Sequence, residues 1–293
     1  MVSLGNVIIN AISISSLYAI IAIGFTLIFG VGGVLNFSHG ALITIGAEAS
    51  WLISGGSSPL ELGLNPAVGL IGGMITAALV SGGLYLGVVR FVEDEPVTLL
   101  ILTFIIGFFI QHACRVFLTG TGNFSVDLIV EGSTNVGGIG FQNISAFIFV
   151  LSMLLVVLTG VFVSRTKTGK AILAVSMSDK GAAIVGIDSR KINLITWLLA
   201  GAFAGIAGVL LTMKNTGTWT MGTQPLILAF SIVILGGLGS IKGSVVGAYI
   251  IGFTETITTQ YIDSSLQGFS ALVLLIVFLL VKPEGLFGRE AAE

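Results

Sequence analysis

The chain has 293 residues, of which 55% are hydrophobic and only 9% are charged, and its formal net charge is −2. Soluble domains carry about 25% charged residues, so this composition excludes a soluble globular protein and indicates an integral membrane protein. The small net charge gives no sign of a nucleic-acid partner, and the single cysteine, Cys114, excludes an intramolecular disulfide and a cysteine-based metal cage.

Apolar segments follow one another along the chain, separated by short polar or glycine-rich stretches. They cover approximately residues 5–29, 41–53, 67–89, 96–118, 144–163, 192–213, 225–235, 245–254 and 269–281. About 20 apolar residues cross a bilayer, so we expect an all-α, polytopic transmembrane bundle of about eight or nine spans. The short segments around Glu48 and Leu235 are predicted to be broken or re-entrant. Residues 1–293 are predicted to form a single transmembrane domain.

Glycine-rich stretches interrupt the chain at 30–40 and 236–244. In both stretches an apolar run meets a glycine pair, and the next helix carries an acid, Glu48 or Glu255. Transporters often contain such repeats, with broken helices near the pathway, although abundant glycine also makes a chance similarity easy. Close helix packing, within the chain or against a second subunit, is predicted by Gly-x-x-x-Gly patterns at 83–87, 201–205 and 243–247.

The loop at 164–191 is the most basic part of the chain. It contains six of the twelve Lys and Arg residues. Because basic loops remain in the cytoplasm, we expect this loop to be cytoplasmic, together with the C-terminal tail that carries Lys282 and Arg289. Counting spans back from the loop places residues 119–143, which lack Lys and Arg, on the outside. The N-terminus is also outside if both short spans cross fully.

A short helix is predicted within this loop, at about 171–185, because small and apolar residues recur there at helical spacing. Asp179 is suited to a helix N-cap, so the segment is expected to break into two helices there. Gly181 lowers helix propensity by about 1 kcal/mol relative to alanine. The alternative is a solvated loop that only sets the topology.

Several polar residues are expected to lie within the membrane. They are Asn36, Ser38, His39, Glu48, Gln111, His112, Arg115 and Glu255. Charged groups are costly in lipid and usually face a bundle interior or an aqueous path. We therefore predict that Asn36, Ser38, His39, Glu48 and Glu255 line a translocation pathway. The alternative for Glu48 is a structural cap or pair, and Arg115 is expected to snorkel from the end of its span.

No catalytic or nucleotide-binding motif stands out. The closest approach to a phosphate-binding loop, SRTKTGKA at 164–171, lacks the first glycine and the hydroxyl residue after the lysine. His39 and His112 lie in separate segments without metal-ligand spacing. We therefore expect a protein that is not an enzyme, with no catalytic residue, metal site or cofactor of its own.

Four stretches together carry a resemblance to a known family. They are GFTLIFGVGGVLNFSHGAL (24–42), SRTKTGKAILAVSMSDKGAAIVGID (164–188), ILGGLGSIKGSVVGA (234–248) and KPEGLFGR (282–289). On these residues, which extend from the first span to the tail, the chain resembles the LivH/LivM-type permease subunits of branched-chain amino acid ABC importers. That family also includes urea-importer permeases.

The resemblance implies an all-helical permease in the cell (plasma or inner) membrane that works with a second related permease subunit. It also implies two cytoplasmic ATPase subunits that use ATP, an extracytoplasmic substrate-binding protein, and a cytoplasmic segment that docks on an ATPase. The residues that match this coupling segment are Asp179, Lys180, Gly181, Ala182, Ala183, Gly186 and Ile187. The common pattern has Glu where this chain has Gly181, which puts any contact of that Glu in doubt.

The leading hypothesis is a permease subunit of an ABC importer for branched-chain or other hydrophobic amino acids. A urea or other small-solute ABC permease is the nearest alternative. An ion-coupled secondary transporter would use Glu48, His39 or Glu255 as relays, and a channel-like protein would have re-entrant loops around Gly32 and Gly237. A secondary transporter has no need of a docking helix in the basic loop.

Overall fold

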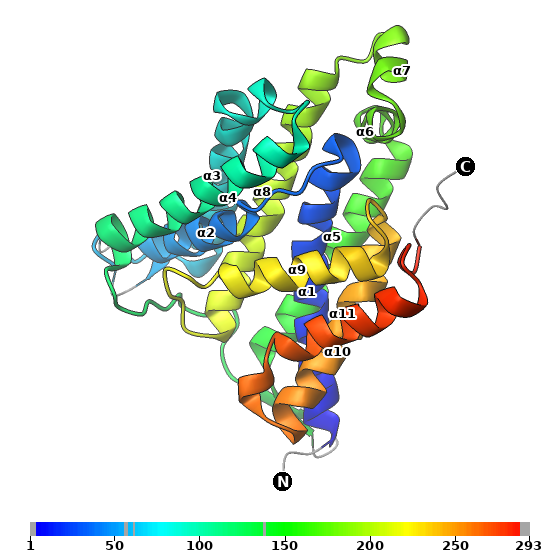
Figure 1. The fold of residues 1–293 in the computed structure, drawn as a ribbon. Helices are drawn as coiled ribbons and strands as arrows, with labels where there is room; N and C mark the ends of the chain where they lie inside the picture. The colour runs from blue at the N-terminus through cyan, green and yellow to red at the C-terminus, as the bar shows by residue number, and fades with distance from the viewer. Residues whose placement is uncertain (1–3, 56–57, 61, 137–138, 288–293) are drawn as a thin grey trace.

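The computed structural model describes residues 4–55, 58–60, 62–136 and 139–287, so Arg289 of the predicted cytoplasmic tail lies outside the described residues. Figure 1 shows a bundle of helices. These are α1 (Leu4–Gly32), α2 (His39–Ser54), α3 (Pro66–Gly87), α4 (Pro96–Cys114), α5 (Asn143–Arg165), α6 (Lys167–Met177), α7 (Asp179–Ile184), α8 (Ser189–Lys214), α9 (Thr223–Gly236), α10 (Ile241–Tyr261) and α11 (Phe269–Val281).

Short irregular elements accompany these helices. Two 3-10 turns cover Val89–Phe91 and Ser264–Leu266, and a π-helical turn, Arg115–Thr119, extends α4. Between α4 and α5, β1 (Ser133–Val136) pairs antiparallel with β2 (Ile139–Gln142), with Ser133 opposite Gln142.

The all-helical prediction is confirmed, and every predicted apolar segment is a helix. Within the described ranges, five helices are long and apolar enough to cross a membrane: α1, α3, α4, α5 and α8. The α9–α10 pair is bent by 119° and gives at most a sixth span. At about 1.5 Å per residue, the 16 residues of α2 reach about 24 Å, less than the ~30 Å hydrocarbon core. Several of the predicted spans are thus broken or short helices.

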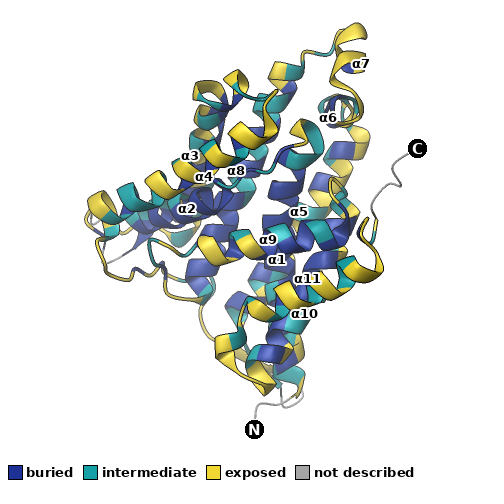
Figure 2. Ribbon diagram, in the orientation of Figure 1, coloured by how far each residue is buried: buried dark blue, intermediate teal, exposed yellow. Residues whose placement is uncertain are grey.

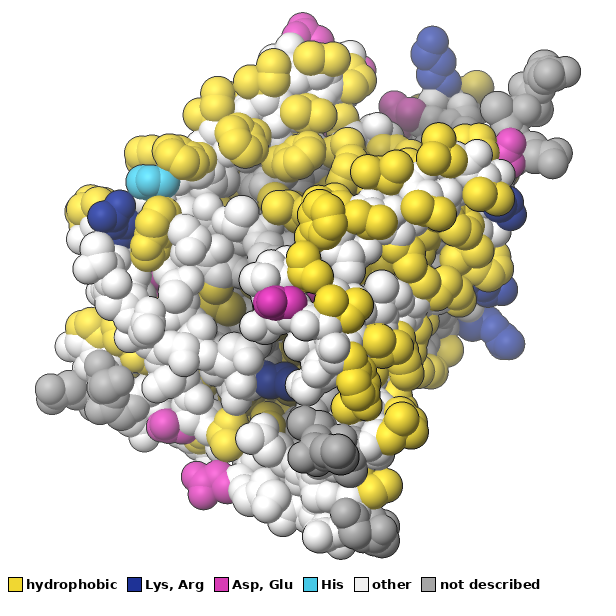
Figure 3. All heavy atoms as spheres, turned by 60° about the horizontal axis from the view of Figure 1, so that its bottom comes forward, with side chains coloured by type: hydrophobic (Ala, Val, Ile, Leu, Met, Phe, Trp, Pro, Cys, Tyr) yellow, Lys and Arg dark blue, Asp and Glu magenta, His cyan; other side chains and the backbone are white. Residues whose placement is uncertain are grey.

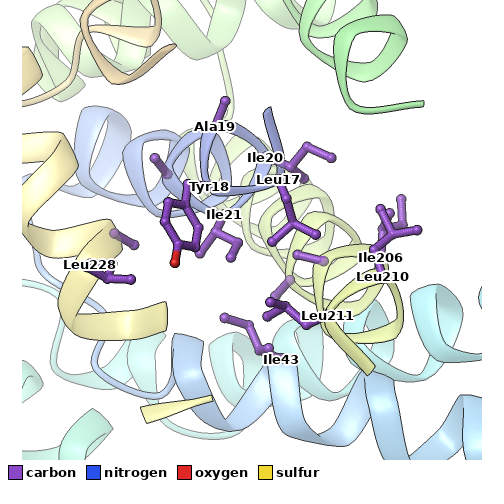
Figure 4. Close-up of a cluster of buried hydrophobic side chains, with 14 of the residues drawn as sticks. Leu17, Tyr18, Ala19, Ile20, Ile21, Ile43, Ile206, Leu210, Leu211 and Leu228 are labelled. Atoms are coloured by element: carbon purple, nitrogen blue, oxygen red, sulfur yellow. The ribbon is translucent and has the colours of Figure 1, made fainter. Parts of the chain in front are cut away.

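Helix α1 is the central helix of the bundle. It contacts α5, α8, α9 and α10, and Figure 2 shows its length mainly in the colour of buried residues. Figure 4 shows Leu17 and Ile21 of α1 among Ile43 of α2, Leu210 of α8 and Leu228 of α9. In a membrane such contacts stabilise the fold through close van der Waals packing rather than through exclusion of water.

Glycines let the helices of this chain approach to backbone contact. A Cβ built on Gly205 of α8 would lie 2.6 Å from the carbonyl oxygen of Gly73 in α3, and one on Gly247 of α10 would lie 2.7 Å from that of Ile232 in α9. By contrast, nothing lies within 4 Å of a Cβ on Gly83 or Gly87. The patterns in α8 and α10 therefore pack within the chain, whereas the pattern in α3 faces outward.

The outer helices expose apolar side chains. Examples are Ile75 of α3, Phe109 of α4, Val157 of α5 and Leu280 of α11. Figure 3 shows hydrophobic side chains concentrated along one flank of the molecule, while uncharged polar groups and backbone dominate the middle of that view. Such a flank suits a surface that contacts lipid or another membrane helix.

Candidate functional site

The basic loop folds into two helices that project from one end of the bundle (Figure 1). Helix α6 ends at Met177 and α7 begins at Asp179, so the predicted break is present. The predicted N-cap is wrong: Ser178 caps α7, and Asp179 is its first residue. The backbone of Ser178 is extended (φ −164°), which lets its Oγ accept a hydrogen bond from the Gly181 N–H at 3.0 Å.

The other end of α7 is closed by a Schellman motif. The Ile187 N–H donates to the Ala182 carbonyl and the Gly186 N–H donates to the Ala183 carbonyl, both at 3.0 Å. Gly186 has φ +83°, a left-handed conformation that favours glycine. Sequence signals at both ends therefore define a helix of only six residues, Asp179–Ile184.

One face of α7 is buried and the other is free in this chain. Ala182 is 3% exposed and packs in a cluster with Ile172, Val175 and Ile192. Ile184 and Val185 are instead 85% and 73% exposed. Large apolar side chains held this far out of the bundle, on a capped helix, form a surface suited to contact with another protein.

The structure brings all seven predicted coupling residues together. Asp179, Lys180, Gly181, Ala183 and Gly186 are exposed, Ile187 is half-buried, and Ala182 anchors the helix. Gly181 is the third residue of α7 and already donates its N–H to Ser178. A glutamate at this position would complete a capping box with Ser178. The Glu that the family pattern has at this position would therefore cap α7 in this fold.

The five predicted pathway residues do not form one site. Asn36, Ser38 and His39 lie together in the turn between α1 and α2, where the Asn36 Oδ1 accepts a hydrogen bond from the Ser38 N–H at 3.0 Å. The His39 ring is buried edge-on against Phe25, with ring centroids 5.9 Å apart.

The two acids lie elsewhere in the bundle. Glu48 of α2 is fully buried, and one of its oxygens accepts a 3.4 Å hydrogen bond from Thr119. The Glu255 carboxylate accepts hydrogen bonds from the backbone N–H of Gly268 (2.9 and 3.0 Å) and Ala271 (3.3 Å) and from the Ser270 hydroxyl (2.6 Å). Glu255 thus caps the start of α11. Among the described residues, no group of three His, Cys, Asp or Glu side chains is placed to hold a metal ion.

Two cavities hollow the end of the bundle from which α7 projects. One, of about 830 Å³, lies between the end of α1, the α6–α7 junction and the α9–α10 break. The glycine-rich stretches at 30–40 and 236–244 meet beside this cavity. A Cβ added to Gly30 would lie 3.7 Å from the Cα of Gly239. The second, of about 540 Å³, lies between α1, α3, α7 and α8. The two cavities therefore flank the base of α7.

The second of these cavities contains a polar cluster. The Glu93 carboxylate accepts hydrogen bonds from the Asn193 amide (3.4 Å) and the Tyr85 hydroxyl (3.5 Å). Burial raises the pKa of the Glu93 carboxyl. This cluster links the loop after α3 to α8, beside the attachment of α7.

A smaller cavity of about 240 Å³ lies between α2, α4 and the start of α9. Its lining includes Phe37, Phe108, Gln111 and Trp219. None of the five predicted pathway residues lines this cavity or the two cavities near α7. The sequence analysis did not predict this cavity, although Gln111 and His112, two polar residues within an apolar segment, gave a partial signal for it. Arg115, which was expected to snorkel, places its guanidinium 5.1 Å from the centre of the Trp219 ring.

Comparison with known proteins agrees with this architecture. The protein family described as "Branched-chain amino acid transport system / permease component" matches residues 7–281. The high-affinity branched-chain amino acid transport system permease protein LivH of Escherichia coli K12 is 28% identical, covering 97% of this chain and 95% of that protein.

More distant relatives extend the comparison to an archaeon and to sugar transport. A probable LivH of Methanocaldococcus jannaschii is 29% identical over 95% of this chain and 91% of that protein. The fructose import permease protein FruF of Bifidobacterium longum is 26% identical over 92% of this chain and 76% of that protein. With nearly its whole length matched, the chain is a multi-pass membrane permease that belongs to the branched-chain amino acid transport system permease family.

Proposed function

We propose that this chain is the permease subunit of an ATP-binding cassette importer and forms the translocation pathway for branched-chain amino acids. The observation that carries the proposal is α7, a capped helix that exposes Ile184 and Val185 on the most basic loop of a family member. Such a surface fits a groove on a cytoplasmic ATPase. Two separate ATPase subunits hydrolyse ATP in this account, because the chain has no phosphate-binding loop.

The distribution of charge supports a cytoplasmic position for α7 and for the C-terminus. Six of the twelve Lys and Arg residues lie in the basic loop, and two more, Lys282 and Arg289, lie in the tail. The other four are Arg90, Arg115, Lys214 and Lys242. The tail returns to the α9–α10 break, where the Leu286 N–H donates to the Leu235 carbonyl at 2.8 Å. Pro283 and Met177 line the same cavity, which places the tail beside α6.

In the mechanism we propose, α7 transmits movement of the ATPases to the bundle. The anchor at Ala182 ties α7 to α6 and α8, and the cavities on both sides of its base leave room for displacement. A partner shifts the balance between inward- and outward-open states only if it binds the two states with different affinity. A second related permease completes the pathway, and an extracytoplasmic binding protein delivers the solute.

The solute is assigned from the relatives. The LivH proteins are named for branched-chain amino acids, and they match almost the whole of this chain. The 26% identity to FruF keeps a sugar as the second candidate. None of the relatives described above is named as a urea permease or an ion-coupled transporter.

The docking role is tested by Ala183→Arg, which places a bulky charge on the exposed face of α7. The variant should insert in the membrane but lose co-purification with its ATPase subunits. Ser164→Arg adds the same charge at an exposed cytoplasmic position outside α7 and should retain them. Intact co-purification of the Ala183→Arg protein would contradict the proposal.

A further inference from the structure

The 240 Å³ cavity beside α4 has the dimensions and position of a solute site. Pockets for drug-sized ligands measure about 300–1,000 Å³, so this cavity fits a smaller solute. It spans Phe104 to His112 on α4. Helix α4 begins at Pro96 on the predicted cytoplasmic side, and these residues lie about 12 to 24 Å along it at ~1.5 Å per residue. The cavity thus lies along the middle and later part of α4, within the length of a span that crosses a ~30 Å membrane core.

Close backbone contacts define the walls of this cavity. A Cβ on Gly40 of α2 would lie 2.6 Å from the carbonyl oxygen of Gly222, which directly precedes α9. The Gly222 N–H also donates to the Thr44 hydroxyl at 3.2 Å. On the other side, a Cβ on Gly107 of α4 would lie 3.1 Å from the Cα of Ser38. The starts of α2 and α9 therefore touch each other, and α4 packs directly on the turn before α2.

The inner end of the cavity is apolar and aromatic. Phe37 packs edge-on against Phe104, with ring centroids 6.5 Å apart. Phe108 and Leu226 complete this end, and the nearby α2 wall is made by Gly40 and Ala41. An aliphatic side chain of a solute would contact aromatic rings here, with no hydrogen-bonding side chain beside it.

The outer end carries the polar groups. The Gln111 amide donates to the Thr223 hydroxyl at 3.3 Å across the cavity. The His112 ring lies 5.0 Å from the Trp219 ring, and the Arg115 guanidinium lies over the same Trp219. This end therefore offers hydrogen bonds from Gln111 and Thr223, with the Arg115 guanidinium nearby on the Trp219 ring.

Helix ends add to the positive potential at this cavity. The N-cap positions of α2 and α9, Ser38 and Gly222, make no side-chain cap hydrogen bond. The first turns of both helices line the cavity. The N-terminus of a helix carries a partial positive charge that favours an anionic group.

We propose that this cavity is an intramembrane subsite that receives the transported solute, with its aliphatic side chain between Phe37, Phe104 and Phe108. The solute carboxylate faces Gln111 and Thr223, which line the outer end. A small amphiphile with one apolar end and one carboxylate end, such as leucine, matches this polarity. A sugar carries hydroxyl groups all around its ring and would leave several of them against the phenyl rings. This inference rests on the proposed function.

The first test compares two neighbouring phenylalanines of α4 in the complete importer, reconstituted with its partner subunits in proteoliposomes. Both are exposed, Phe108 by 57% and Phe109 by 71%, but only Phe108 lines the cavity. Phe108→Ala should lower ATP-driven leucine uptake at least ten-fold while the ATPase subunits stay bound. Phe109→Ala should transport within two-fold of the wild type. Equal uptake by the two variants would overturn the subsite.

Wild-type uptake separates failure of the subsite from failure of the proposed function. If the wild-type importer takes up leucine but Phe108→Ala behaves as Phe109→Ala, only the subsite is wrong. If the wild type takes up no branched-chain amino acid, the proposed function is wrong as well.

A second test measures occupancy directly and does not depend on transport. In a Cys114→Ser background, Thr223→Cys places a thiol at the cavity and Thr216→Cys places one outside it. Leucine should slow modification of Thr223→Cys by a thiol reagent at least three-fold without affecting Thr216→Cys, and fructose should slow neither. Equal modification with and without leucine would overturn the subsite, and protection by fructose alone would overturn the amino-acid assignment.

Discussion

Glu255 is a buried acid that could either line a translocation pathway or stabilise the fold. Its position within an apolar segment predicted a pathway residue, because charges in membrane helices usually mark such sites. In the structure both carboxylate oxygens are used at the start of α11, where Gly268, Ser270 and Ala271 donate to them. A carboxylate at a helix N-terminus is favoured by the helix dipole. These contacts support a structural role for Glu255 rather than a pathway role.

Replacement of Glu255 separates these two roles. Glu255→Ala leaves buried N–H groups without an acceptor, at a cost of about 1–3 kcal/mol each, and should lower the Tm of the purified protein by several degrees. Glu255→Gln keeps one carbonyl oxygen and should lose less. Thermal unfolding in detergent measures the difference. An unchanged Tm in Glu255→Ala together with lost uptake would instead indicate a pathway residue.

At the scale of elements, α8 is held by glycine contacts with α3. Gly205 lies against the Gly73 carbonyl, and Gly201 lies equally close to the carbonyl of Ala77. These contacts set the distance between the two helices, which in turn support the buried side of α2.

A matched pair of glycine substitutions tests this packing. Gly205→Ala places a methyl group 2.6 Å from the Gly73 carbonyl and 2.8 Å from the Ala77 Cβ, so the helices must separate. We expect a loss of about 1–3 kcal/mol in stability, the usual cost of overpacking. Gly83→Ala meets nothing within 4 Å and should leave the stability of the purified chain unchanged or slightly raised. Chemical unfolding in detergent compares the two, and equal effects would contradict the assigned contacts.

Most elements could be predicted from the sequence because apolar runs bounded by glycine or polar stretches carry the signal. The limits of α10 show where this fails. The apolar run ends near Thr254, yet the helix continues to Tyr261, and within it the hydroxyls of Thr256 and Thr259 donate to the carbonyls of Gly252 and Glu255. The 119° angle between α9 and α10 could not be predicted from the sequence either, because a glycine-rich stretch indicates a break but does not specify its angle.

At the scale of the whole molecule, the cavities differ in kind. Two open cavities flank the projecting α7, and the aromatic cavity lies between α2, α4 and the start of α9. The short helix that carries the proposed coupling residues could be predicted because its signals are contiguous, from Asp179 to Ile187. The aromatic cavity could not, because it joins Phe37, Phe108 and Trp219 from distant parts of the sequence, and only their packing reveals it.

The measurement that tests the central claim most directly is leucine uptake into proteoliposomes that contain this chain with or without its partner subunits. The account predicts uptake only when ATP, the ATPase subunits and the external binding protein are all present. It also predicts that an ion gradient cannot replace ATP. Uptake by this chain alone, driven by an ion gradient, would contradict the claim that the chain is the permease subunit of an ATP-driven importer.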